Sequence, residues 1–217
     1  MPDQTSALIE ALLEEVRAHP GHQMSPYRRS ELYRAYDQSG DGFLQSVPAW
    51  LACLTASRVL PAFEARYTVD LRPREMLELA VHALEGLVER DVVLKKLDEG
   101  YHSAGNAWGY DEAEMPWPAW LSANTAYHAL REATGYRPLS ILPGRMVGEV
   151  PVLWTDEELC QHDVADAASA AAMALAMDIT DGHAVPERLL GFWTWWLTQA
   201  IPAAVNCVSD GWPEPKG

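Results

Sequence analysis

Apolar side chains recur at helical spacing along almost the whole chain. In the first such segment Leu8, Leu12 and Val16 line one face, and Pro20 ends the helix. The same pattern predicts eight helices, in residues 5–19, 25–36, 47–67, 71–87, 92–101, 119–134, 155–178 and 186–208. No repeat and no convincing linker interrupts them. We therefore expect residues 1–217 to form one all-α domain, a bundle of about eight helices.

Two features refine this helical pattern. Residues 136–154 are rich in proline and glycine and could contain a short strand, but the isolation of the segment argues against a sheet. Thr155 and Glu158 have the spacing of a capping box, in which the hydroxyl accepts from the Glu158 amide and Glu158 reaches back. We therefore expect little or no strand, and an alanine-rich helix that begins at Thr155 and runs to about Asp178.

Residues 37–48, DQSGDGFLQSVP, have the outline of a calcium-binding loop. Asp37, Ser39 and Asp41 occupy the first, third and fifth positions of such a loop, and Gly42 occupies the position of the sharp turn. The twelfth position normally carries a glutamate that binds the ion through two oxygens, but here it is Pro48. We therefore expect no calcium site, and a helix that begins near Pro48.

Composition limits the classes of function. With 31 acidic and 16 basic residues the formal net charge is −15, which repels nucleic acid and anionic membranes and would attract a basic partner. The same acidity could serve solubility alone. No apolar run approaches the ~20 residues of a membrane span, no signal-peptide pattern is present, and three scattered cysteines suit a reducing compartment. We expect a cytoplasmic protein with no cofactor.

Catalytic motifs are sparse. The sequence has no Gly-x-Ser-x-Gly elbow, no glycine-rich phosphate loop and no cysteine in a known local motif. One arrangement is compatible with a metal site. It consists of His128, the adjacent His162 and Asp163, and Asp178, which loosely follow the ligand order of helical metal-dependent phosphohydrolases. A metal-dependent hydrolase is therefore the alternative to a binding protein without metal.

Asp163 and Asp166 lie at the first turns of the expected alanine-rich helix. They either belong to a site, or they cap the helix and pair with an arginine such as Arg131. Both interpretations stay open at the level of the sequence.

Aromatic and acidic side chains gather in residues 105–118, where the helical pattern breaks. This composition is typical of an interface, in which aromatic anchors lie within a charged rim. The alternative is that the aromatic rings fold back and fill the end of the bundle. Trp195 lies about 100° from the apolar stripe of the last helix and could face a second layer or a partner. The candidate partner-binding residues are Trp108, Tyr110, Asp111, Glu112, Glu114, Trp117, Asp163, Asp166 and Trp195.

Residues 58–86 carry a specific combination of side chains. Its members are Leu60-Pro61, Phe63-Glu64, Tyr67, Asp70, Arg72-Pro73-Arg74 and Glu78. With the aromatic residues 192–205, they resemble the immunity protein five-like family of bacterial polymorphic toxin systems. The resemblance implies an all-helical cytoplasmic protein that binds and neutralises a cognate toxin, and it carries over no catalytic residue. The acidic residues 105–118 depart from the family's usual alanine- and histidine-rich middle helices.

The charged residues of this combination have a structural explanation. Asp70 can cap a helix start, and Arg72 and Arg74 can reach Glu64 or Glu78 on facing helices. We favour this architectural role over toxin contact. The sequence therefore supports a stoichiometric toxin inhibitor whose acidic surface docks on a basic face of its partner.

Overall fold

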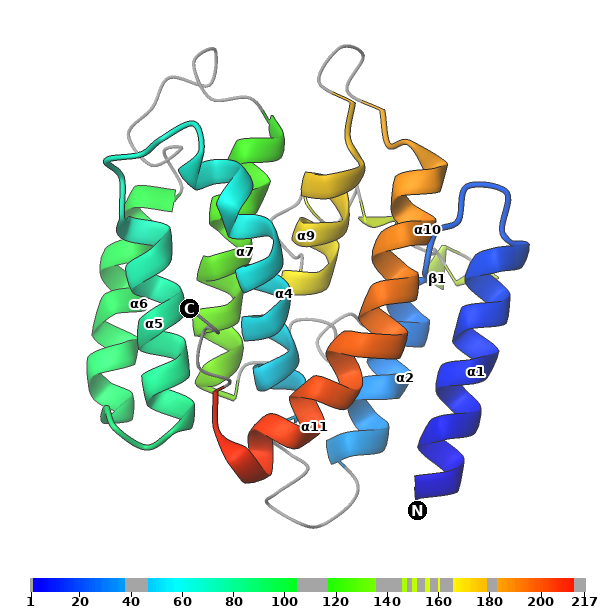
Figure 1. Cartoon of the computed structure of the whole chain (residues 1–217), viewed down its shortest axis with the longest axis horizontal. Coiled ribbons are helices and arrows are strands. Elements are labelled where there is room, and N and C mark those ends of the chain that lie inside the picture. Colours follow the sequence, from blue (N-terminus) through cyan, green and yellow to red (C-terminus); the bar gives the residue numbers. More distant parts are fainter. Residues whose placement is uncertain are drawn as a thin grey trace.

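The computed structural model describes residues 2–37, 47–104, 117–135, 146–147, 150–151, 155–156, 160, 166–178 and 183–212. Its helices are α1 (Pro2–Ala18), α2 (Pro26–Asp37), α4 (Val47–Glu64), α5 (Arg72–Leu84), α6 (Arg90–Ala104), α7 (Trp117–Ala133), α9 (Ala167–Ala176) and a last run of α10 (Pro186–Trp195), η3 (Trp196–Ala200) and α11 (Ile201–Asp210). Counting that last run once, this described part of the chain contains eight helices. The predicted all-α bundle is confirmed (Figure 1).

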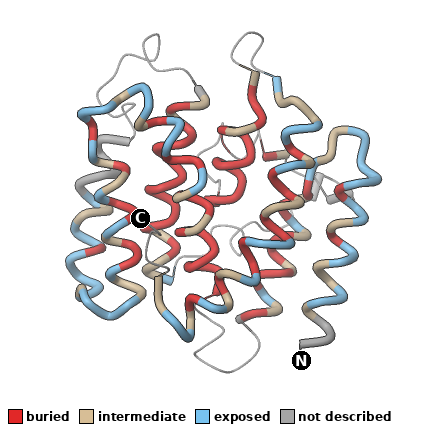
Figure 2. The backbone as a smooth tube through the Cα atoms, viewed as in Figure 1, coloured by how far each residue is buried: buried red, intermediate tan, exposed pale blue. Residues whose placement is uncertain are grey.

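Helices α4 and α7 form the centre of the bundle. Both are buried on most sides, and every side chain from 121 to 130 in α7 is buried, which is the pattern of a core helix. Helices α5 and α6 cover one side of this pair, while α9, α10, α2 and α1 lie on the other (Figure 1). Figure 2 shows buried residues concentrated in the central helices, with exposed residues on the outer helices α1, α5 and α6.

The last helical run contains a local widening. Residues Trp196–Ala200 form a π-helix, in which the Ile201 amide donates to the Trp196 carbonyl five residues earlier. Pro202 follows directly, and a proline has no amide hydrogen and clashes with the carbonyl four residues before it. The wider turn accommodates Pro202, so the helix continues to Asp210.

Three local predictions can be compared with the structure. Helix α4 runs through Pro61 and ends at Glu64, three residues before the expected end at Tyr67. Residues 38–46 of the calcium-like loop lie outside the described residues, and α4 begins at Val47, as expected for a helix start near Pro48.

The segment rich in proline and glycine contains minimal β structure. Met146–Val147 (β1) pairs antiparallel with Val150–Pro151 (β2), so the described residues hold a sheet of two strands with two residues each. The expectation of little strand is met, although isolation of the segment does not prevent this short ladder. Within the described ranges, no helix is both long and apolar enough to cross a membrane.

The prediction of one continuous alanine-rich helix from Thr155 is wrong: Asp156 and Cys160 are helical, as expected for a start at Thr155, but the helix is interrupted at Asp166. Helix α9 begins at Ala167 and not at Thr155, because Asp166 has extended backbone angles and its carboxylate accepts from the Ser169 amide at 2.8 Å. Asp166 is therefore the N-cap of this helix. Glu158 lies outside the described residues, so the capping box remains a prediction.

Candidate functional site

The guanidinium of Arg29 lies in the core of the bundle with 0% of the residue exposed. Arg29 precedes Leu32, Tyr33 and Tyr36 on α2 by three, four and seven residues, so helical geometry places it on the buried face. A buried charge destabilises a fold unless it is paired and hydrogen-bonded. The surroundings of Arg29 therefore decide how this region is held together.

Arg29 is paired with two carboxylates from the second half of the chain. Its Nη2 donates to Asp156 Oδ1 at 2.7 Å, and its Nε and Nη2 donate to the two carboxylate oxygens of Asp166 at 3.3 Å each. Nη2 also donates to Ser169 Oγ, and Nη1 donates to the Met24 carbonyl at 3.0 Å. These contacts join α2, the preceding connection and the start of α9.

Aromatic side chains complete the surroundings of this charge. The Arg29 guanidinium lies 5.1 Å from the centre of the Trp193 ring, a cation–π contact. The Tyr33 hydroxyl donates to Asp166 Oδ2 at 3.0 Å. We call Arg29, Tyr33, Asp156, Asp166, Ser169 and Trp193 the buried arginine cluster.

The two carboxylates of the cluster have opposite pKa shifts. Burial raises the pKa of Asp156 and the Asp166 charge adds to this, while Arg29 opposes it. Burial also acts to raise the pKa of Asp166, but the Arg29 charge and hydrogen bonds from Ser169 and Tyr33 outweigh burial and lower it. Asp166 is therefore the firmly ionised partner, and Asp156 is the less fully compensated one.

Asp166 is not part of an exposed surface. The residue is 0% exposed, and both carboxylate oxygens accept hydrogen bonds inside the protein. The alternative interpretation, a helix cap paired with an arginine, is what the structure shows, with Arg29 in place of Arg131. Asp163 lies outside the described residues.

Helix α7 contributes two buried titratable groups, Glu132 and His128, near the start of α9. Glu132 Oε1 accepts from the Ala167 amide at 3.0 Å, so a second carboxylate stabilises the positive end of α9. His128 is buried, and burial together with the Arg131 charge lowers its pKa to about 3, against a weaker opposing effect of Asp166. His128 is therefore a neutral core side chain.

The metal-dependent alternative gains no support from the described residues. Among them, no group of three or more His, Cys, Asp or Glu side chains could hold a metal ion. His162 and Asp163, two of its four proposed ligands, lie outside these residues. Asp178, another of the four proposed ligands, follows an isolated β-bridge between Met177 and Ala184, and its amide donates to the His183 carbonyl at 2.9 Å.

The charged residues of the 58–86 segment form two ion pairs. Arg74 donates through Nε and Nη2 to the two Glu64 oxygens at 2.7 Å each, which links α5 to the end of α4. Arg72 pairs instead with Asp70, at 2.8 and 2.6 Å, and its amide donates to the same carboxylate at 3.2 Å. Glu78 is exposed on α5. Asp70 and Arg74 thus have the local structural contacts expected from the sequence, and Arg72 does not reach Glu64 or Glu78.

We expect the Glu64–Arg74 pair to contribute less than about 1 kcal/mol to the free energy of unfolding, because the two side chains are 31% and 35% exposed. A double-mutant cycle of Glu64→Gln and Arg74→Ala, followed by urea unfolding, measures the coupling. Glu78→Gln on the same helix is the control. A coupling above about 2 kcal/mol would show that the pair behaves as a buried one.

The structure describes only two of the aromatic candidates for partner binding, Trp195 and Trp117. Trp195 is half-buried on α10, where the Arg58 guanidinium of α4 lies 4.5 Å from the ring centre and the centre of the Phe192 ring lies 5.8 Å from it. Trp195 thus packs against α4 as part of a second layer, and the residue remains partly exposed. Trp117 begins α7. Trp108, Tyr110, Asp111, Glu112 and Glu114 lie outside the described residues, and their role stays a prediction.

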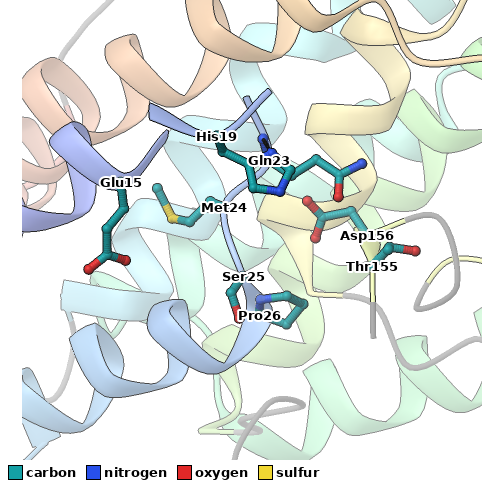
Figure 3. A pocket seen from close by; sticks show the side chains of 8 residues that line it. All are labelled: Glu15, His19, Gln23, Met24, Ser25, Pro26, Thr155 and Asp156. Carbon is teal, nitrogen blue, oxygen red and sulfur yellow. Dashed lines mark hydrogen bonds between the residues drawn. The ribbon is translucent and has the colours of Figure 1, made fainter. Parts of the chain in front are cut away.

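A cleft of about 320 Å³ opens beside the buried arginine cluster. It lies between the end of α1, the connection to α2 and residues 155–156 (Figure 3). The residues that line it are Glu15, His19, Gln23, Met24, Ser25, Pro26, Thr155 and Asp156. We call it the Asp156 cleft, because Asp156 connects it to Arg29.

Sequence reasoning missed Arg29 and this cleft. The available signal was the position of Arg29 on the apolar stripe of α2, at helical spacing from Leu32, Tyr33 and Tyr36. A basic residue in such a stripe indicates a buried partner, but the sequence does not say which of 31 acidic residues supplies it.

Comparison with protein-family models gives a match over most of the chain. The family model described as Immunity protein Imm5 matches residues 9–203. No curated protein matches the chain. The matched range includes the 58–86 segment, every residue of the buried arginine cluster and the lining of the Asp156 cleft. Since the match spans most of the chain and agrees with the all-helical fold, the protein belongs to the Imm5 family of immunity proteins.

Proposed function

We propose that this protein binds a cognate bacterial toxin and neutralises it as a stoichiometric inhibitor, with residues 105–118 as the main contact. Membership of the Imm5 family over residues 9–203 is the observation that carries the proposal. A protein inhibitor needs an accessible surface and not a catalytic centre, and within the buried arginine cluster Arg29, Tyr33 and Ser169 all donate to Asp166.

Charge and composition support an acidic contact surface. The formal net charge of −15 attracts a basic partner over a distance, because the summed field of many like charges steers association. Residues 105–118 combine three acidic side chains with three tryptophan or tyrosine rings ahead of Pro118, a composition suited to anchors within a charged rim. Figure 1 shows the end of α6 and the start of α7, which flank this segment, at the same end of the bundle.

We expect the triple variant Asp111→Asn, Glu112→Gln and Glu114→Gln to associate with the toxin on the order of tenfold more slowly, because it removes charge that steers the encounter. The loss should shrink at high salt, since the Debye length falls from ~10 Å at 0.1 M to ~3 Å at 1 M. Stopped-flow mixing with the toxin domain encoded next to the gene measures the rate at each salt concentration.

A matched control and a second set of variants sharpen this experiment. Neutralising three exposed acids elsewhere, Glu89, Asp91 and Glu187, changes net charge equally and should slow association less. Trp108→Ala or Trp117→Ala should instead speed dissociation by about tenfold or more, because buried apolar contact is lost. If neither the association rate nor the dissociation rate changes in these variants, the contact lies elsewhere on the protein.

A further inference from the structure

The Asp156 cleft is a pre-formed feature with fixed walls. Arg29 holds two lining residues at once, because it donates to the Met24 carbonyl and to Asp156. The His19 ring accepts the Gly21 and Gln23 amides through Nδ1 at 3.1 and 3.4 Å, which fixes the turn after α1. A cleft that is organised before binding loses less conformational entropy when it is filled.

The carboxylates at the cleft outnumber their cations. Arg28 is shared between Glu15, at 2.7 and 2.9 Å, and Glu31. Arg29 is shared between Asp156 and Asp166. Among the described residues, four carboxylates, of which Glu15 and Asp156 line the cleft, therefore share two guanidinium groups, which leaves a formal excess of two negative charges.

The lining offers no compensating cation of its own. None of the eight described lining residues is a lysine or an arginine, and the one histidine, His19, already uses Nδ1 to accept backbone amides. The raised pKa of Asp156, caused first by burial and then by the Asp166 charge, is what an incompletely paired carboxylate shows. A cation in the cleft would meet unbalanced negative charge.

Size and depth define the kind of cation. A volume of about 320 Å³ is at the lower end of ligand pockets, so it suits one long side chain better than a cofactor. Asp156 is only 5% exposed, so a flat surface contact does not reach its carboxylate. Lysine and arginine carry a charge at the end of a long apolar stem. Met24 and Pro26 line the cleft and offer apolar surface for such a stem (Figure 3).

We propose that the Asp156 cleft receives one arginine or lysine side chain of the toxin partner, which pairs with Asp156 at depth and Glu15 at the rim. This inference rests on the proposed function, because it takes the partner to be a toxin domain. It adds a second contact, formed by α1 and α2, to the one assigned to residues 105–118.

The test introduces a positively charged side chain of this protein into the cleft. Gln23 is exposed and lines the cleft, so Gln23→Arg should fold normally and weaken toxin binding by about tenfold or more, whereas Gln199→Arg on an exposed position of η3 should not. Glu15→Gln should weaken binding, and Glu14→Gln, the same change one residue away outside the lining, should not. Titration calorimetry with the purified toxin domain gives the affinities, and thermal unfolding checks the fold of each variant.

A toxin-free measurement separates the two proposals. Argininamide is titrated into the isotope-labelled protein, and shifts of the Gln23 and Ser25 amides that are absent in Gln23→Arg support a cation site. If the toxin binds all variants equally, the cleft is not a contact and the inference is overturned, while the proposed function stands. If the wild type binds no toxin, the proposed function fails; the argininamide titration then decides the cleft, and an absence of shifts would overturn it too.

Discussion

Replacing Arg29 by leucine is expected to lower the free energy of unfolding by about 3–5 kcal/mol, whereas the same change at its neighbour Arg28 should cost less than about 1 kcal/mol. The two arginines are adjacent and each contacts two carboxylates, but Arg29 is 0% exposed and the Arg28 side chain is 27% exposed. The pair of variants therefore compares one interaction in the core with a similar one at the surface.

The physical reason is the charge that remains after the substitution. Without Arg29, Asp156 and Asp166 stay in the core with no cation, and the Met24 carbonyl loses its donor. Removing one partner of a buried ion pair leaves an uncompensated charge, which is far more destabilising than removing the whole pair. Arg29→Lys should lie between wild type and Arg29→Leu, because a lysine cannot reproduce the planar fork of donors.

Urea unfolding of the variants gives the free energies. Adding Asp156→Asn and Asp166→Asn to Arg29→Leu should restore part of the lost stability, because the stranded charges are then gone. Equal costs for Arg28→Leu and Arg29→Leu, or no recovery in the triple variant, would mean that the buried arginine cluster is not held by charge pairing.

The second large effect concerns pH and His128. The pKa of His128 is about 3 in the folded protein because of burial and the Arg131 charge, against 6.5 for an ordinary histidine. Between these values the unfolded chain binds a proton that the folded protein does not, so folding becomes less favourable as the pH falls. The contribution is complete above pH 6.5 and should decline by about 1.4 kcal/mol per pH unit below it.

The measurement is the difference between wild type and His128→Phe. Between pH 6.5 and 5 the wild type should lose about 2 kcal/mol more than the variant, in urea unfolding at each pH. His82→Gln, at an exposed position of α5, keeps the core unchanged and should retain the wild-type slope. A variant with the same pH slope as the wild type would show that His128 is not buried in its neutral form. Burial raises the pKa of Asp156, and Arg29 with its neighbouring donors lowers that of Asp166, but both carboxyls are present in wild type and variant, so the difference between the two proteins isolates His128.

Periodicity predicted most of the fold because each helix buries one continuous stripe. The stripe of Leu189, Phe192, Trp193 and Trp196 is buried as expected, and the helix starts at Pro26 and Pro186 were correct. These features depend on neighbours three or four residues away. Such neighbours are visible in the sequence.

The candidate site could be predicted only in part, because its partners are far apart in the chain. Arg74 and Glu64 are ten residues apart, and the sequence named Glu64 as one of two candidate partners, with Glu78 as the other. Arg29 and Asp166 are 137 residues apart, and helical spacing does not indicate that they meet. For the same reason Asp166 was assigned to a partner surface, although its carboxylate lies in the core.

These long separations also set the order in which the chain can complete its core during synthesis. Arg29 meets partners 127 to 140 residues later, and Trp196 donates to Thr55 Oγ1 across 141 residues. At the usual ~5–20 residues per second, a ribosome needs roughly 7–28 s to make such a stretch. During that interval α2 presents an unpaired guanidinium, and α4 lacks its contact with Trp196. The nascent protein therefore has no complete Asp156 cleft until residue 156 has left the ribosome, and no finished core until Trp196 has followed it.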